Sequence, residues 1–94
     1  MRALVLTPKF KRAYRKFTRR HGRLVSGIEE TLRQMAANVY SPSLSTHKLG
    51  GKLSGLWACS CGYDWRIVFS IEMDADTREE VIVLLDIGTH DEVY

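Results

Sequence analysis

The chain has 94 residues, of which 45% are hydrophobic and 27% are charged, and its formal net charge is +3. This composition excludes a disordered chain, and the length predicts one domain, residues 1–94, with a single modest core. No apolar run approaches the roughly 20 residues of a membrane helix, and the apolar patch before Pro8 is too short for a signal peptide. We therefore expect a cytoplasmic protein that does not contact the membrane.

Charge is divided unevenly along the chain. Residues 1–52 contain twelve of the fourteen Lys and Arg residues but only two of the eleven carboxylates. Residues 53–94 contain the other nine carboxylates and only Arg66 and Arg78. This asymmetry predicts a basic surface that meets an acidic partner, either nucleic acid or an acidic protein.

The first half of the chain predicts a strand followed by a helical hairpin. Residues 3–6 (ALVL) form a short strand, and Thr7-Pro8 is typical of an N-cap followed by proline at the first helical position. An apolar stripe at helical spacing marks the first helix as far as His21-Gly22: Phe10, Ala13, Tyr14 and Phe17. A second stripe marks a helix that ends at Tyr40-Ser41-Pro42: Leu24, Ile28, Leu32, Met35, Ala36 and Val39.

Cations cover the rest of the first helix, and no acid is interleaved with them. They are Lys9, Lys11, Arg12, Arg15, Lys16, Arg19 and Arg20. Such a face is either simply solvated or a binding surface, and the absence of acids favours binding.

The second half predicts a loop and then three strands. Residues 43–55 form the loop, residues 56–61 a strand, Gly62-Tyr63 a tight turn and residues 64–72 the partner strand. A polar turn at residues 74–78 leads to a buried strand at residues 80–87 and a polar tail at residues 88–94. The order β-α-α-β-β-β predicts an α+β fold, in which an antiparallel-rich sheet carries the helical hairpin on one face and leaves the other open. Cys59 and Cys61 are expected to be buried or half-buried thiols.

The strand from Asp64 alternates between two faces. Trp65, Ile67, Phe69 and Ile71 would face the core, and the open face would carry Asp64, Arg66, Val68 and Ser70. Arg66 on such a face is either an anion-binding group or a solvated strand residue.

The polar side chains of the loop, the strand and the tail suggest phosphodiester cleavage of RNA. In that reaction a base takes the ribose 2′-OH proton, an acid protonates the leaving 5′-oxygen, and a cation stabilises the charged phosphate. Histidine suits both proton roles. The candidates are His47, Asp64, Arg66, His90 and Tyr94. Taken singly, each histidine has an equal claim to be a surface or hydrogen-bonding residue. No cofactor is expected, and no metal site, because His and Cys do not occur at ligand spacing.

The whole chain resembles the RelE/ParE superfamily of bacterial toxins, and within it the YafQ-type branch. Three segments carry the resemblance: residues 47–49 (HKL) with 55–57 (GLW), residues 64–69 (DWRIVF) and residues 88–94 (GTHDEVY). The resemblance implies a toxin of a type II toxin–antitoxin system, an endoribonuclease that cuts mRNA in the ribosomal 30S A site. It also implies a cognate acidic antitoxin as partner, besides the ribosome with its mRNA and rRNA.

The resemblance also assigns roles to single residues. His90 matches the principal acid/base histidine of the family, His47 its loop histidine and Asp64 an active-site aspartate. Tyr94 matches a terminal aromatic residue that stacks or orients the substrate, and Arg66 matches a phosphate-binding arginine. The residues expected to bind RNA or the ribosome are Lys9, Arg12, Arg15, Lys16, Arg19, Lys48 and Lys52.

Two positions depart from the branch. Ser60 stands where the branch has a further histidine, and Asp86 stands where it has an arginine. Arg66, Lys48 or Lys52 would have to compensate for the missing cation. The alternative function is that of a ParE-like gyrase inhibitor without RNase chemistry, because the same scaffold serves both. The histidines at 47 and 90 favour the nuclease, since a gyrase inhibitor has no chemical use for them.

Overall fold

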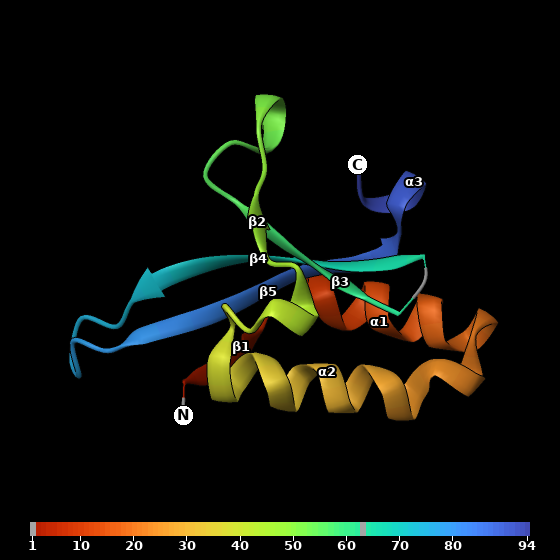
Figure 1. Ribbon diagram of the computed structural model, residues 1–94, viewed down its shortest axis with the longest axis horizontal. Coiled ribbons are helices and arrows are strands. Elements are labelled where there is room, and N and C mark those ends of the chain that lie inside the picture. The colour runs from red at the N-terminus through yellow and green to blue at the C-terminus, as the bar shows by residue number, and fades with distance from the viewer. Residues whose placement is uncertain (1, 63) are drawn as a thin grey trace.

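The computed structural model describes residues 2–62 and 64–94, with only the backbone of Cys61. A mixed sheet of five strands in the order β1-β5-β4-β3-β2 lies against a helical hairpin (Figure 1). β1 runs parallel to β5, and the other neighbours are antiparallel. The strands are β1 (Ala3–Leu6), β2 (His47–Lys48), β3 (Trp57–Cys61), β4 (Trp65–Met73) and β5 (Glu80–Thr89).

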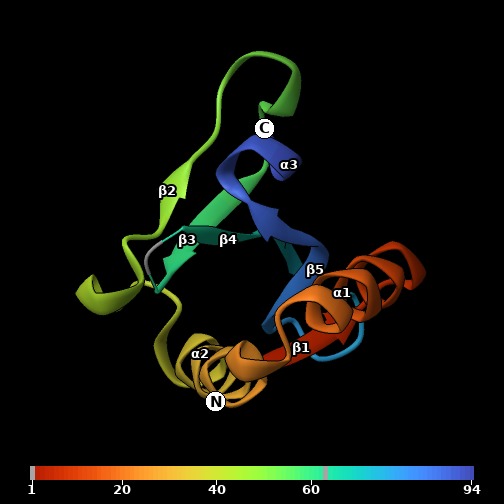
Figure 2. The ribbon, with the colours of Figure 1, turned by 90° about the vertical axis from the view of Figure 1, so that its right-hand side faces the viewer.

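Both long helices cover the same face of the sheet, as predicted (Figures 1 and 2). Thr7 caps the first of them, since its hydroxyl oxygen accepts a hydrogen bond of 3.1 Å from the backbone N–H of Phe10. A short C-terminal helix rises from the opposite face. The helices are α1 (Pro8–Arg20), α2 (Val25–Asn38) and α3 (His90–Val93), with 3-10 turns η1 (Gly22–Leu24), η2 (Pro42–Leu44) and η3 (Gly51–Leu53).

The core lies between this hairpin and the sheet. The predicted alternation of β4 is confirmed, because Trp65, Ile67 and Phe69 are buried and Ile71 is partly buried against them. The helices contribute Phe10, Phe17, Ile28 and Met35, and β5 contributes Ile82, Leu84 and Ile87.

A β-bulge in the pairing of β4 with β5 explains why the buried residues of β5 do not alternate strictly with exposed ones. Val68 pairs with Asp86 and Phe69 pairs with Leu84, so that Leu85 is the extra residue. The bulge resets the alternation. Leu84 and Ile87 therefore both reach the core, although an odd number of positions separates them.

Three predictions about the fold need correction. Residues 43–55 are not only a loop, because β2 pairs with β3 there and η2 and η3 flank it. Residues 88–94 do not all lie beyond the last strand, because β5 continues to Thr89 and α3 follows. The second face of the sheet is not open throughout. Ala58 and Val68 on it are buried, and α3 packs on β4 and β5.

The cysteine and turn predictions are only partly covered by the described residues. Cys59 is buried, as expected, with its Sγ 3.7 Å from the Sδ of Met35. Gly62 lies in the turn with φ of +65°, a conformation that favours glycine. Tyr63 and the side chain of Cys61 lie outside the described residues.

Candidate active site

The β4–β5 pair brings most of the predicted site residues to one end of the sheet. Arg66 pairs with Gly88, and Trp65 pairs with Thr89, the last residue of β5. Directly after Thr89 the chain leaves the sheet and forms α3, on the face that the long helices do not cover (Figure 1). Alternation along β4 directs the Arg66 side chain to this same face, because Trp65 and Ile67 point into the core.

α3 places His90 and Tyr94 against each other. Their ring centroids are 4.6 Å apart, and the rings meet edge to face at 83°. The backbone N–H of His90 donates to the carbonyl oxygen of Asp64 at 3.3 Å, which anchors the start of α3 to the beginning of β4. The Nδ1 of His90 lies 3.6 Å from a carboxylate oxygen of Asp91. The His90 side chain is 58% exposed, which leaves it open to a substrate.

Arg66 lies close enough to Tyr94 to act on its ionisation. Burial raises the pKa of the Tyr94 phenol above its usual value of 10.0, and the positive charge of Arg66 acts in the opposite direction. Arg66 is half-buried and donates a hydrogen bond of 3.1 Å from its guanidinium to the carbonyl oxygen of Trp65. The beginning of β4 thus presents a cation beside an aromatic hydroxyl.

His47 lies farther away, on the arm formed by residues 47–56. It pairs with Ala58 of β3, and Ala58 pairs with Val68 of β4, so these residues and Arg66 point to one face. Two strand spacings of about 4.8 Å each separate β2 from β4. The His47 Nδ1 is 2.9 Å from the carbonyl oxygen of Ser45. A carbonyl can only accept, so Nδ1 carries the proton and Nε2 of the neutral ring keeps a free lone pair.

The two lysines of the arm have different surroundings. Lys48 pairs with Trp57, whose partner Phe69 faces the core, so Lys48 lies on the opposite face from Arg66. Its Nζ lies 5.4 Å from the centre of the Trp57 ring. Lys52 is exposed in η3. The arm and α3 rise from the same face of the sheet in both views (Figures 1 and 2).

The cations of α1 are exposed but lie on the helical side of the sheet (Figure 1). No ion pair joins any of them to a carboxylate within residues 2–62 and 64–94. Two of them, Lys16 and Arg20, line a small cavity of about 160 Å³ with Asp86 and Glu92. This cavity is the point where the basic face of α1 meets α3.

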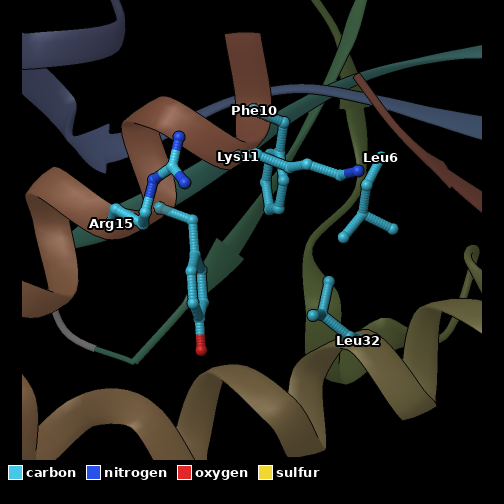
Figure 3. Close-up of a pocket in the computed structure, with 6 residues that line it drawn as sticks. Leu6, Phe10, Lys11, Arg15 and Leu32 are labelled. Carbon is cyan, nitrogen blue, oxygen red and sulfur yellow. The ribbon is translucent and has the colours of Figure 1, made fainter. Parts of the chain in front are cut away.

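A larger pocket of about 390 Å³ lies away from His90 and Arg66, between β1, α1 and α2 (Figure 3). Its lining is mostly apolar, and Lys11 and Arg15 stand at it as cations. Leu6, 43% exposed, borders it, and the neighbouring Val5 is 44% exposed. None of the predicted acids and bases lines this pocket. It is lined by Leu6, Phe10, Lys11, Tyr14, Arg15 and Leu32.

Within the described residues, no group of three or more His, Cys, Asp or Glu side chains could hold a metal ion. No helix in that part of the chain is long and apolar enough to cross a membrane.

Comparison with known proteins gives the family. A model of YafQ, a bacterial toxin of type II toxin–antitoxin systems, matches residues 2–94. The chain belongs to the YafQ toxin family. No curated protein sequence matches it.

Solved structures with this fold include other toxins. YafQ from E. coli strain BL21(DE3) matches with a TM-score of 0.78 at 10% identity, over 100% of this chain and 99% of that one. YafQ in the E. coli DinJ–YafQ toxin–antitoxin complex matches with a TM-score of 0.76 at 12% identity, over 99% and 97%. The YoeB/ParE toxin from Agrobacterium tumefaciens matches with a TM-score of 0.72 at 19% identity, over 94% and 98%. At these identities the likeness shows the fold alone, a RelE-like α+β fold.

Sequence reasoning missed the residues that hold α3 in place. Thr89 and Glu92 form the pattern Thr-x-x-Glu, a signature of a helix N-terminus that was present in this YafQ-family sequence. The pattern was overlooked because the segment is too short to show helical periodicity.

The closeness of Arg66 and Tyr94 can be tested by titration. Because the Arg66 charge favours the ionised phenol, Arg66→Gln should raise the pKa of Tyr94 further. Tyrosine-labelled NMR, with the Tyr94 signal assigned from Tyr94→Phe, would measure it. Arg78→Gln removes the same charge from the distant β4–β5 turn and should leave the Tyr94 pKa unchanged. An equal shift in both variants would show only a net-charge effect.

Proposed function

We propose that this YafQ-family toxin is a ribosome-dependent mRNA endonuclease that acts in the cytoplasm and cuts mRNA in the 30S A site without a metal or cofactor. The observation that carries the proposal is the meeting of His90, Tyr94 and Arg66 at the end of β4 and β5. RNA cleavage needs proton-transfer groups and a cation that stabilises the charged phosphate, and here a histidine and an arginine lie at the same end of the sheet.

In the proposed reaction the ribose 2′-oxygen attacks the adjacent phosphorus and loses its proton to a base. The bond from phosphorus to the 5′-oxygen breaks, and an acid protonates that oxygen. The products are a 2′,3′-cyclic phosphate and a free 5′-hydroxyl. No electrons are exchanged with an outside group, and water is not consumed in this step.

The surroundings of the histidines support different roles. His90 is exposed beside Tyr94, with the Asp91 carboxylate 3.6 Å from its Nδ1, and we assign it the role of the acid. The free Nε2 lone pair of His47 suits the base. Arg66 would stabilise charge on the phosphate, and Tyr94 would stack on or orient a nucleobase of the RNA. Asp64 supplies the carbonyl that anchors α3 and presents an exposed carboxylate at the rim of the site.

The exposed cations away from this site would bind the ribosome. Phosphate contacts position a nucleic acid without taking part in its chemistry, which fits cations on the helical side of the sheet. Lys52, on the arm, would contact RNA near the site, and Lys48 would do so from beside Trp57. The proposed binding residues on α1 are Lys9, Arg12, Arg15, Lys16 and Arg19.

The decisive test is His90→Ala in a purified translation reaction, with mRNA cuts mapped by primer extension. We expect the cleavage rate to fall about 10²–10⁴-fold, the usual contribution of a general acid or base. The fold should persist, because His90 is exposed. His21→Ala, which removes the exposed histidine between α1 and α2, is the matched control and should cleave normally.

A His90→Ala protein that cleaves at the wild-type rate would contradict the proposal. So would a wild-type protein that leaves mRNA intact but inhibits DNA supercoiling by gyrase, the outcome that the ParE-like alternative predicts.

Charge reversal on α1 tests the binding face. The triple variant Arg12→Glu, Arg15→Glu, Arg19→Glu should bind ribosomes at least 10-fold more weakly, while the single-turnover rate at saturation changes little. Wild-type binding should weaken steeply with added salt, and the variant should show a shallower salt slope, because fewer counterions are released. Binding that is insensitive to salt would assign this face to another partner.

We also propose that an acidic antitoxin neutralises this toxin. The solved DinJ–YafQ structure is a toxin–antitoxin complex that contains a protein of the same fold. Here the exposed cations of α1 and the apolar pocket beside Lys11 and Arg15 favour a segment that alternates acidic and apolar residues (Figure 3). Such a segment can order itself on binding and cover a wide surface, including α3.

This proposal predicts where the antitoxin protects the toxin. Co-expression with the product of a neighbouring acidic reading frame should give a complex in which α1 and residues 88–94 exchange amide hydrogens more slowly than in the free toxin. Arg15→Glu should weaken the complex at least 10-fold, because it places a like charge at the pocket. Arg78→Glu makes the same change in the β4–β5 turn and should not weaken it. Protection confined to that turn would contradict the proposal.

A further inference from the structure

The helix that carries His90 and Tyr94 cannot hold its own shape. α3 has four residues, about one helical turn, and the N–H of Tyr94 donates to the carbonyl oxygen of His90 at 3.1 Å. A single turn fixes several backbone angles for one hydrogen bond and is unstable alone. The positions of the two rings therefore depend on contacts that α3 makes outside itself.

Glu92, a residue of α3, makes one such contact with the residue that precedes the helix. Its Oε1 accepts a hydrogen bond of 2.8 Å from the backbone N–H of Thr89, the residue where β5 ends and α3 begins. This hydrogen bond lowers the pKa of Glu92 below its usual value, and the charges of Arg20 and Lys16 on α1 act in the same direction. Glu92 is thus ionised at neutral pH and joined to the junction of strand and helix.

Gly88 provides the surface on which the same side chain rests. A Cβ atom at Gly88 would lie 3.0 Å from the Cβ of Glu92, 3.1 Å from its Oε1 and 3.2 Å from a methyl group of Val93. Such separations are tighter than most real Cβ contacts, so a larger residue at position 88 would push the side chains of Glu92 and Val93 away from β5 by a few tenths of an ångström. Gly88 is also the partner of Arg66 in β4. The contact therefore sets the height of α3 above the proposed phosphate-binding arginine.

We propose that Glu92 is a positioning residue of this toxin: its hydrogen bond to the Thr89 N–H, with its packing on Gly88, holds His90 and Tyr94 in place over Arg66. The inference rests on the proposed function, because the reaction gives this positioning its purpose. Glu92 itself need not touch the RNA. A displacement of about 1 Å in a reacting group can cost about 10²-fold in rate, so the effect on catalysis should be large although no reacting group is lost.

The test compares Glu92→Ala, Glu92→Gln and the control Glu29→Ala in single-turnover cleavage on programmed ribosomes. Glu29 is an exposed carboxylate on α2, and its replacement changes the net charge equally. Glu92→Ala should lower the maximal rate 10- to 100-fold and leave the KM for ribosomes within about twofold. Glu92→Gln keeps an acceptor oxygen for the Thr89 N–H and should recover the rate to within about fivefold of wild type.

A second measurement keeps the inference testable apart from activity. In NMR spectra the ring of Tyr94 should shift the His90 ring protons in the wild type, in Glu92→Gln and in Glu29→Ala. The shift should be lost in Glu92→Ala and also in Gly88→Ala, which disturbs the same contact without changing charge. The signals of the buried core should stay in place in all four variants.

The outcomes separate the two proposals. If Glu92→Ala matches Glu29→Ala in rate while His90→Ala is inactive, this inference is wrong and the proposed function stands. If Glu92→Gln is as slow as Glu92→Ala, or if only KM changes, the carboxylate acts through its charge or by binding RNA, and the positioning role is wrong. If His90→Ala cleaves normally, the proposed function fails, and the NMR comparison alone decides whether Glu92 holds α3.

Discussion

The register between β4 and β5 is the constraint on which both the core and the candidate site depend. It places Arg66 opposite Gly88 and Trp65 opposite Thr89, so that the cation lies where β5 ends. A shift of one residue would turn Arg66 into the core and Trp65 out of it. Burial of Trp65, Ile67 and Phe69 opposes that shift. The hydrophobic core therefore fixes the position of the polar site, although the site residues contribute almost nothing to the core.

The basic surface and the candidate site lie on opposite faces of the same sheet. The hairpin of α1 and α2 must bury its apolar stripe on one face, so its cations are displayed on the helical side. α3 and the arm rise from the other face, where the strand residues between the core positions point. Under the proposed function, attraction to a large anionic partner and reaction at one phosphate would thus be carried by different surfaces. Lys16 and Arg20, in the last turns of α1, line a cavity together with Glu92 of α3.

The periodicity of apolar residues and the helix-capping residues predicted the parts of the fold that local sequence determines. The alternation in β4 and the stripes of the two long helices were confirmed because each has several apolar residues and one buried face. The strand β2 could not be predicted, since it contains only His47 and Lys48 and exists through its pairing with β3. The same pairing decides that His47, and not Lys48, shares a face with Arg66. Register across three strands is non-local information that a single polar dipeptide does not carry.

The candidate site shows the same limit more sharply. The sequence indicated which residue types suit RNA cleavage, and the structure brings Asp64, Arg66, His90 and Tyr94 to one end of the sheet. The sequence did not indicate that the backbone carbonyl of Asp64 accepts the N–H of His90, because a carbonyl has no sequence signature. The Thr-x-x-Glu pattern marked a helix start at Thr89, but the contact of α3 with Asp64, 26 positions before His90, is non-local.

Ser60 and Asp86, the two residues that depart from the YafQ branch, both lie near residues of the candidate site. Ser60 pairs with Arg66, so the histidine that the branch has at this position would lie directly beside the cation. Here that position carries a serine, and under the proposed function the two proton roles fall to His90 in α3 and His47 on the arm. Asp86 lies with Lys16 and Arg20 around one small cavity, where the arginine of the branch would be repelled by both. The carboxylate instead allows the basic end of α1 to approach α3. The cations of this cavity are therefore Lys16 and Arg20 of α1, and they lie beside Glu92 in the turn that carries His90.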